Sequence, residues 1–144
     1  VRAHYLRYDP AGSPSALESS GFEIDSTLGW ATHEGFRRGT CVPFMLFDLS
    51  ANRETEVAEF PLIVRESTLF NRRNYTLSEA VDATDNLIES CRQHGGVFVG
   101  LWHNILWDED DFPGWGEHFT TSLAIADKKN GLIGSISSVF RSWE

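Results

Sequence analysis

Short apolar runs alternate with helical patterns along this chain of 144 residues, and that alternation restricts the folds open to it. The apolar runs have strand length and cover 22–25, 60–64 and 97–103. Helical signals lie at 13–21 and at 76–91. Strands that alternate with helices are typical of α/β folds. No repeat or Gly/Ser-rich linker divides the chain, so we predict one α/β domain over 1–144.

The ends of the predicted helices carry recognisable signals. Ser13 precedes a proline, which is typical of a helix start, and Gly21 is a typical helix terminator. Thr76 and Glu79 have the T-x-x-E spacing of a capping box. The segment 29–59 has no steady period, and we expect a long connection over one end of the sheet that contains a short hairpin.

A further helix is predicted to begin near Trp115. Its spacing is expected to turn Phe119, Leu123 and Ala126 inward. The acidic run 108–111 before it lacks the glycine and the spacing of a calcium-binding loop, so a solvated loop is the better interpretation.

Composition excludes several classes of function. Twelve Lys and Arg against 21 Asp and Glu give a net charge of −9, which argues against nucleic acid and against a polybasic membrane-docking surface. Cys41 and Cys91 are too few for a disulfide scaffold or a cysteine-rich zinc site. With no apolar run of membrane-spanning length and no signal peptide, a soluble chain is expected. Val1 stands where Met is usual, which suggests a piece of a longer protein or a mature product.

The three apolar runs each finish on ionisable residues. The runs end at Asp25, at Arg65 with Glu66, and at His103. Catalytic groups gather at the carboxyl ends of strands in parallel α/β proteins. Polar residues also end strands for purely structural reasons, so both interpretations stay open.

The histidines do not predict a metal site in this chain alone. None of the five histidines has H-x-H, H-x-x-H or H-x-x-x-H spacing, and no C-x-x-C occurs. Zinc commonly needs three or four protein ligands. We therefore predict that the chain by itself binds no metal.

Several tryptophans lie in or next to the predicted loops. Trp30, Trp102 and Trp107 are candidates for sugar binding, because an exposed indole offers an apolar face to a pyranose ring. The alternative is that these indoles pack in the core.

Several motifs, in this order along the chain, resemble the polysaccharide deacetylase family. Residues 2–5, Arg-Ala-His-Tyr, resemble its R-x-P-Y motif with His in place of Pro, and 101–103, Leu-Trp-His, match its L-x-H motif. Residues 21–29, 35–44 and 59–66 resemble a divergent branch of that family. The likeness runs over nearly the whole chain and corresponds to the C-terminal half of the catalytic domain.

The resemblance implies a fold and a reaction. The fold is an irregular (β/α)₇ barrel, of which this chain would supply about half. The reaction is the metal-dependent removal of N-acetyl or O-acetyl groups from a carbohydrate. In that family an Asp and an H-x-x-x-H pair in the N-terminal half hold the divalent ion, so zinc is expected in the full-length parent and not in this chain.

The resemblance also implies roles for single residues. His103 would donate a proton to the leaving amine, and the backbone N–H of Tyr5 would stabilise the oxyanion. Arg2 would orient a general base that lies outside this chain. A carboxylate would hold the His103 imidazolium, with Asp25 and Glu66 both candidates.

Two other functions remain open at this stage. One is a catalytically inactive deacetylase-like module that binds a glycan through its tryptophans. The other is a related hydrolase of small cyclic amides. A half-barrel would leave sheet edges and an apolar face uncovered, so we expect a homo-oligomer or a chain held by its missing half.

Overall fold

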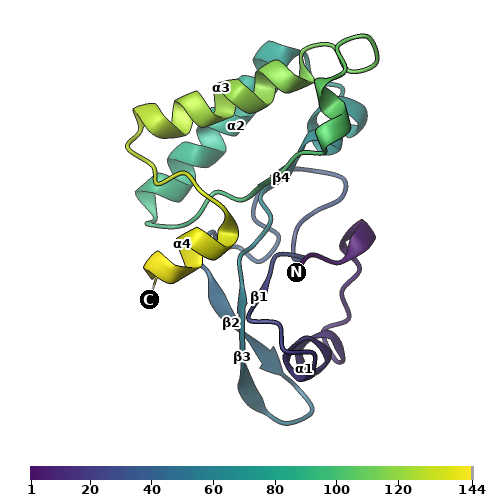
Figure 1. Ribbon diagram of the computed structural model, residues 1–144, viewed down its shortest axis with the longest axis vertical. Coiled ribbons are helices and arrows are strands. Elements are labelled where there is room, and N and C mark those ends of the chain that lie inside the picture. The colour runs from purple at the N-terminus through teal and green to yellow at the C-terminus, as the bar shows by residue number, and fades with distance from the viewer. Residues whose placement is uncertain (144) are drawn as a thin grey trace.

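The computed structural model describes residues 1–143 and shows a mixed α/β arrangement with two small sheets (Figure 1). The barrel expected from the resemblance stays a prediction. Short helical turns lie at His4–Leu6, Thr68–Arg72 and Asn104–Trp107. The longer elements in chain order are α1 (Ser13–Ser19), β1 (Ile24–Asp25), β2 (Phe44–Asp48), β3 (Arg53–Glu59), β4 (Val64–Arg65), α2 (Leu77–Gln93), β5 (Gly100–Leu101), α3 (Trp115–Lys128) and α4 (Ile136–Trp143).

The larger sheet has the strand order β1-β3-β2. β2 and β3 form an antiparallel hairpin, with an irregularity in register between Met45 and Phe47. This hairpin lies inside the segment 29–59, where a short hairpin was expected. β1 pairs with β3 in parallel, which places Asp25 opposite Glu59 at the carboxyl ends of both strands.

The smaller sheet is a parallel pair, β4 and β5, and is shorter than the apolar runs predicted. Residues 60–63 are not in a strand, because Pro61 has no N–H for a ladder. Beyond it, Ile63 and Val64 both donate to the carbonyl oxygen of Val99, at 2.9 and 3.3 Å. Two donors on one acceptor are not a regular ladder, so the paired region is limited to two residues in each strand.

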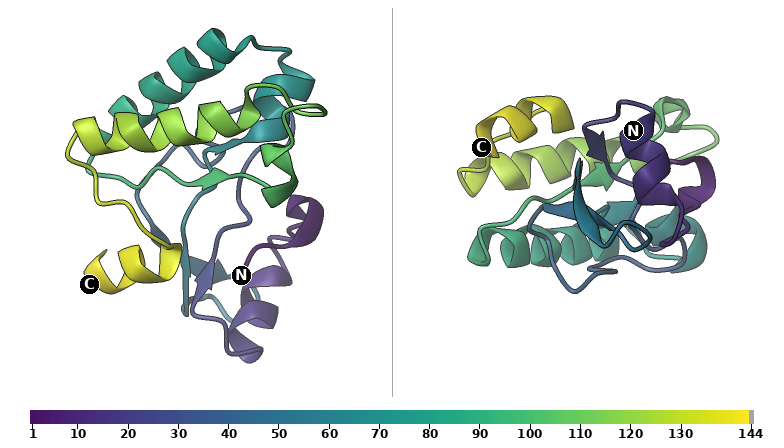
Figure 2. Two further views of the ribbon diagram at one scale, coloured as in Figure 1. Left: turned by 45° about the horizontal axis from the view of Figure 1, so that its top comes forward. Right: turned by 90° about the horizontal axis from the view of Figure 1, so that it is seen from below.

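The helices predicted from end signals are present. Figures 1 and 2 show α2 and α3 side by side at the end of the molecule opposite α1. The capping box is complete: the backbone N–H of Thr76 donates to the Glu79 carboxylate at 2.8 Å, and that of Glu79 donates to the Thr76 hydroxyl at 3.3 Å.

The inward face of α3 differs from the prediction. Trp115, His118 and Ser122 are buried, whereas Leu123 is 38% exposed. The expectation for Leu123 was therefore wrong. The helix is rotated because the His118 ring reaches Thr84 of α2, and a buried imidazole needs such a polar partner.

Helix α4 was not predicted from the sequence. It has no fully buried residue, yet Phe140 and Trp143 both place their rings edge-on to Phe60, with centroids 6.0 Å apart in each pair. Phe60 itself is fully buried in a core cluster with Leu62. Within the described part of the chain, no helix is both long and apolar enough to cross a bilayer.

Candidate functional site

The sheets bring acidic side chains and one histidine to the carboxyl ends of their strands. β1 ends at Asp25 and β3 at Glu59, Glu66 follows β4, and His103 follows β5. β1 runs parallel to β3, and β4 runs parallel to β5. Asp25, Glu59 and Glu66 are all buried, which is unusual for carboxylates and requires polar partners.

His103 forms a close pair with Glu66. The distance between His103 Nδ1 and Glu66 Oε1 is 2.6 Å. The His103 side chain is 55% exposed, whereas that of Glu66 is 3% exposed. Of the two carboxylates that were candidates for this role, Glu66 is therefore the one paired with His103. When Nδ1–H donates to this carboxylate, Nε2 is the nitrogen left to exchange a proton with a ligand.

A small hollow adjoins the His103 ring. It has a volume of about 210 Å³, and its lining includes His103, Trp102, Trp107 and Phe119. Trp107 is 57% exposed and meets Phe119 edge-on at 5.8 Å between centroids. Trp102 lies deeper, stacked on His118 at 5.4 Å. Two of the three predicted sugar-binding indoles thus lie beside the histidine, and Trp107 offers the more accessible face.

Trp30 is not part of that hollow. Its ring is 38% exposed and lies 4.6 Å from the His33 ring, with the Arg37 guanidinium 5.4 Å above its centre. These contacts are within its own loop. Tyr5 is 74% exposed and has a positive φ of 59° in the turn His4–Leu6.

Arg2 is held by the segment that follows β1. Its Nε donates to the Ser26 carbonyl oxygen at 2.8 Å, and its terminal NH₂ group donates to the Ser26 hydroxyl at 2.9 Å. Burial lowers the pKa of Arg2 from its ordinary value, against the opposing effect of the negative charges of Asp25, Glu59 and Glu66. Arg2 is thus a partly buried cation that faces three buried carboxyl groups.

Glu59 was not among the site residues predicted from the sequence. The predicted strand began at residue 60, so Glu59 was placed ahead of a strand, whereas it is the last residue of β3. The usable signal was the alternation in β3 itself, where Thr55 and Val57 are buried and Glu54 and Glu56 are exposed.

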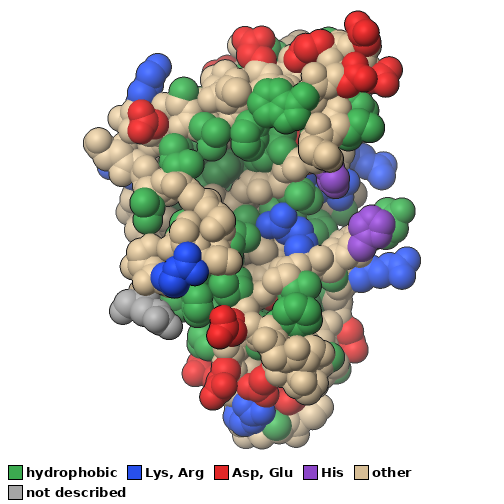
Figure 3. Space-filling view, in the orientation of Figure 1, with side chains coloured by type: hydrophobic (Ala, Val, Ile, Leu, Met, Phe, Trp, Pro, Cys, Tyr) green, Lys and Arg blue, Asp and Glu red, His purple; other side chains and the backbone are tan. Residues whose placement is uncertain are grey.

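Exposed acidic side chains gather over the loop that precedes α3 (Figure 3). The run 108–111 forms this loop, as expected, and its carboxylates accept hydrogen bonds from the loop backbone: Asp108 from Asp110 N–H at 3.1 Å and Glu109 from Gly114 N–H at 2.9 Å.

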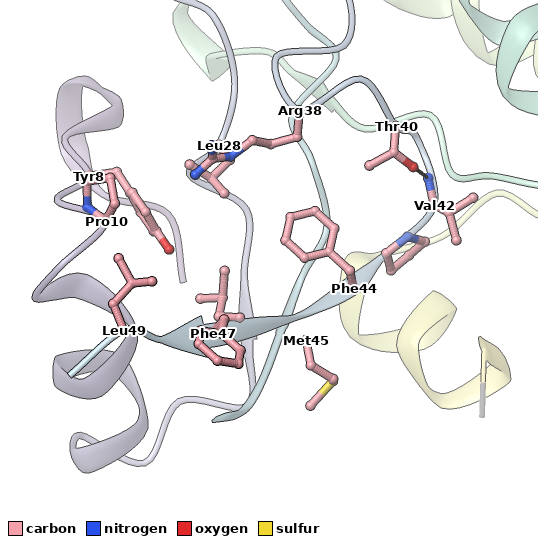
Figure 4. A pocket seen from close by; sticks show the side chains of 12 residues that line it. Tyr8, Pro10, Leu28, Arg38, Thr40, Val42, Phe44, Met45, Phe47 and Leu49 are labelled. Carbon is pink, nitrogen blue, oxygen red and sulfur yellow. Dashed lines mark hydrogen bonds between the residues drawn. The ribbon is translucent and has the colours of Figure 1, made fainter. Parts of the chain in front are cut away.

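A larger hollow of about 650 Å³ lies between the N-terminal loop and β2 (Figure 4). Its walls include Tyr8, Leu28, Phe44 and Phe47. Neither His103 nor Glu66 contributes to its lining. The pair of His103 and Glu66 and this second hollow therefore belong to different parts of the surface.

The described residues contain no group of three or more His, Cys, Asp or Glu side chains placed to hold a metal ion. The described residues therefore do not themselves form a site for the divalent ion that the family resemblance implies. Comparisons with protein-family models, with curated proteins and with solved structures returned no match.

Proposed function

We propose that this chain supplies the proton-donor side of a carbohydrate deacetylase, with the divalent ion held by residues outside the chain. The observation that supports this most directly is the pair of His103 and Glu66, 2.6 Å apart, with the carboxylate buried and the ring exposed. Such a carboxylate fixes the ring orientation and directs Nε2 outward. The hollow lined by Trp102 and Trp107 would then hold the sugar.

In this proposal four of the chain's own residues have separate tasks. His103 protonates the amine that leaves when the amide bond breaks. Glu66 keeps the ring in place, because its carboxylate is buried by the surrounding side chains and pairs with His103 Nδ1. Trp107 stacks against the apolar face of the sugar. Arg2 is a positioning residue held on Ser26, rather than a group that touches substrate.

The test replaces His103 by Asn in the full-length protein that contains this chain. Acetate release from N-acetylglucosamine oligomers is measured, and we expect turnover to fall about 10²- to 10⁴-fold. His94→Asn is the matched control, since His94 is exposed and its Nδ1 contacts only the Ser90 carbonyl oxygen. A His103→Asn variant that keeps more than about a tenth of wild-type turnover contradicts the assignment.

A glycan-binding module without catalysis is the second candidate, and the exposure of Trp107 beside the hollow favours it. The two functions are distinguished by measuring oligomer binding and acetate release on the wild-type protein, with Trp107→Ala as the control for binding. Binding of the oligomer, seen as a change in tryptophan fluorescence that Trp107→Ala removes, together with no acetate release, favours the binding module. Acetate release that depends on added divalent ion favours the deacetylase.

A further inference from the structure

The carboxyl groups of Asp25 and Glu59 form a buried pair across β1 and β3. The two residues are partners in the parallel register, and both have 0% of their surface exposed. One oxygen of each is already occupied. The Thr27 hydroxyl donates to Asp25 Oδ1 at 2.7 Å, and the Leu28 N–H donates to Glu59 Oε1 at 2.9 Å.

The other two oxygens have no donor among the described residues. Asp25 Oδ2 and Glu59 Oε2 are both buried and unpartnered. The two carboxyl groups are near enough for the charge of Asp25 to raise the pKa of Glu59. Two ionised carboxylates buried side by side would repel each other, and neither would have a hydrogen to donate to the other. One proton between them satisfies both oxygens at once.

We infer that Asp25 and Glu59 share one proton, and that Glu59 thereby positions the segment from Asp25 to Leu28 on which the N-terminal residues are held. Three contacts tie that segment to the N-terminus. Ser26 N–H donates to the Val1 carbonyl oxygen at 3.0 Å, Ala3 N–H donates to the Thr27 hydroxyl at 2.9 Å, and Arg2 binds Ser26. Glu59 holds the far end of the segment through Leu28.

Burial and the charge of Asp25 favour retention of the proton by Glu59, whereas the charge of Arg2 opposes it. Arg2 is the nearby cation, and its charge also faces Glu66. The Tyr8 phenol faces both members of the pair from the N-terminal loop, and burial together with their negative charge raises its pKa to about 12. Figure 4 shows the Arg38 side chain extending toward Leu28 on the other side of the hollow. Burial raises the pKa of Glu59 to about 8, and the charge of Asp25 adds to this, against the Leu28 N–H and Arg2.

The direction of the pH dependence follows from these states. In the unfolded chain Glu59 has its ordinary pKa of 4.5 and loses its proton above that pH, whereas the folded chain keeps the proton up to about pH 8. The contribution of Glu59 to stability is therefore complete below pH 4.5. It declines as the pH rises and is lost once the pH passes about 8.

The experiment compares the 144-residue chain with its Glu59→Gln variant by urea unfolding at several pH values from 5 to 9. The Gln amide donates to Asp25 as the protonated acid does, and it does not titrate. We expect the unfolding equilibrium constant of the wild type, divided by that of the variant, to rise about tenfold per pH unit between pH 5 and 8 and then to level off. Glu54→Gln, an exposed position on the same strand, is the control and should follow the wild type. If the unfolding equilibrium constants of wild type and Glu59→Gln change with pH by the same factor, the inference is overturned.

A second measurement needs no variant. Carbon-13 NMR of the Glu59 side-chain carboxyl in the wild-type chain should show a titration midpoint near pH 8, and a midpoint below pH 5 overturns the shared proton. The shared proton does not depend on the proposed deacetylation, because neither readout involves a sugar, a metal ion or turnover. A protein without deacetylase activity can still show it.

Discussion

His118 should make this protein sensitive to mild acid, and the structure specifies why. The His118 Nε2 atom lies 3.2 Å from the Ala80 carbonyl oxygen and 3.0 Å from the Thr84 hydroxyl oxygen. A carbonyl oxygen can only accept, so Nε2 carries the proton of the neutral ring and Nδ1 carries a lone pair. Nδ1 is buried and has no partner among the described residues. Protonation would place an N–H without an acceptor, and a charge, in the interior.

The size and sign of the effect follow from linkage. Burial lowers the pKa of His118 from its ordinary value of 6.5, so the unfolded chain takes up the proton before the folded chain does. The contribution of neutral His118 to the free energy of unfolding is fully present above pH 6.5. It is lost as the pH falls toward the folded-state pKa, at up to about 1.4 kcal/mol per pH unit. Between pH 6.5 and 5.5 the wild type should lose stability relative to a variant that cannot titrate at this position, by at most about 1 kcal/mol.

The variant that tests this is His118→Phe, measured by urea unfolding at pH 7.5, 6.5 and 5.5. A phenyl ring keeps the stacking on Trp102 and the edge contact with Phe70, whose centroid is 5.5 Å from that of the imidazole. The variant and the wild type can differ in stability at any one pH, so the change in the free energy of unfolding with pH is compared between them. Glu59 is present in both proteins, and its contribution cancels in the difference. His94→Gln is the exposed control. If the free energy of unfolding changes with pH by the same amount in wild type and in His118→Phe, the reasoning is refuted.

Other outcomes are also expected from the structure. Gly29→Ala should destabilise the fold by about 1–3 kcal/mol in chemical denaturation, because the new Cβ would lie 2.6 Å from Leu62 Cβ and 2.8 Å from its carbonyl oxygen; unchanged stability would show that this contact is not rigid. Thr76→Ala should cost about 1 kcal/mol in the same assay, since it removes the capping box of α2, whereas Thr76→Ser should retain most of it. Elemental analysis of the purified chain should find less than one zinc, cobalt or nickel ion per molecule, and a tight one-to-one site would contradict the placement of the ion outside the chain.

The helices could be predicted from local sequence because their signals are local. The capping box at Thr76 and the proline after Ser13 act within one turn of the chain. The rotation of α3 could not be predicted in this way. Its buried face is set by the contact between His118 and Thr84 of α2. A hydrophobic pattern that counts histidine as polar therefore predicts a different buried face.

Part of the site could be predicted because strand ends concentrate polar groups. Asp25, Glu66 and His103 were named as residues that end apolar runs, whereas Arg2 was named only from the family resemblance. The choice of Glu66 as the partner of His103 needed the three-dimensional distance. Glu59 was missed because the end of β3 was not recognised, and its role arises only from the parallel register with β1. Pairing between distant strands is not encoded in any local pattern.

The topology of the larger sheet has a consequence for the order of folding. The hairpin of β2 and β3 closes across residues 49–52, whereas Ile24 of β1 meets Ala58 only after the intervening chain of more than thirty residues has closed. The entropy of closing a long loop must be offset before such a contact forms, so non-local strand pairs tend to form late. We therefore expect the hairpin to acquire protection against amide hydrogen exchange first, during refolding. The buried pair of Asp25 and Glu59 would therefore be assembled after the hairpin, and the proposed shared proton would be enclosed only at that step.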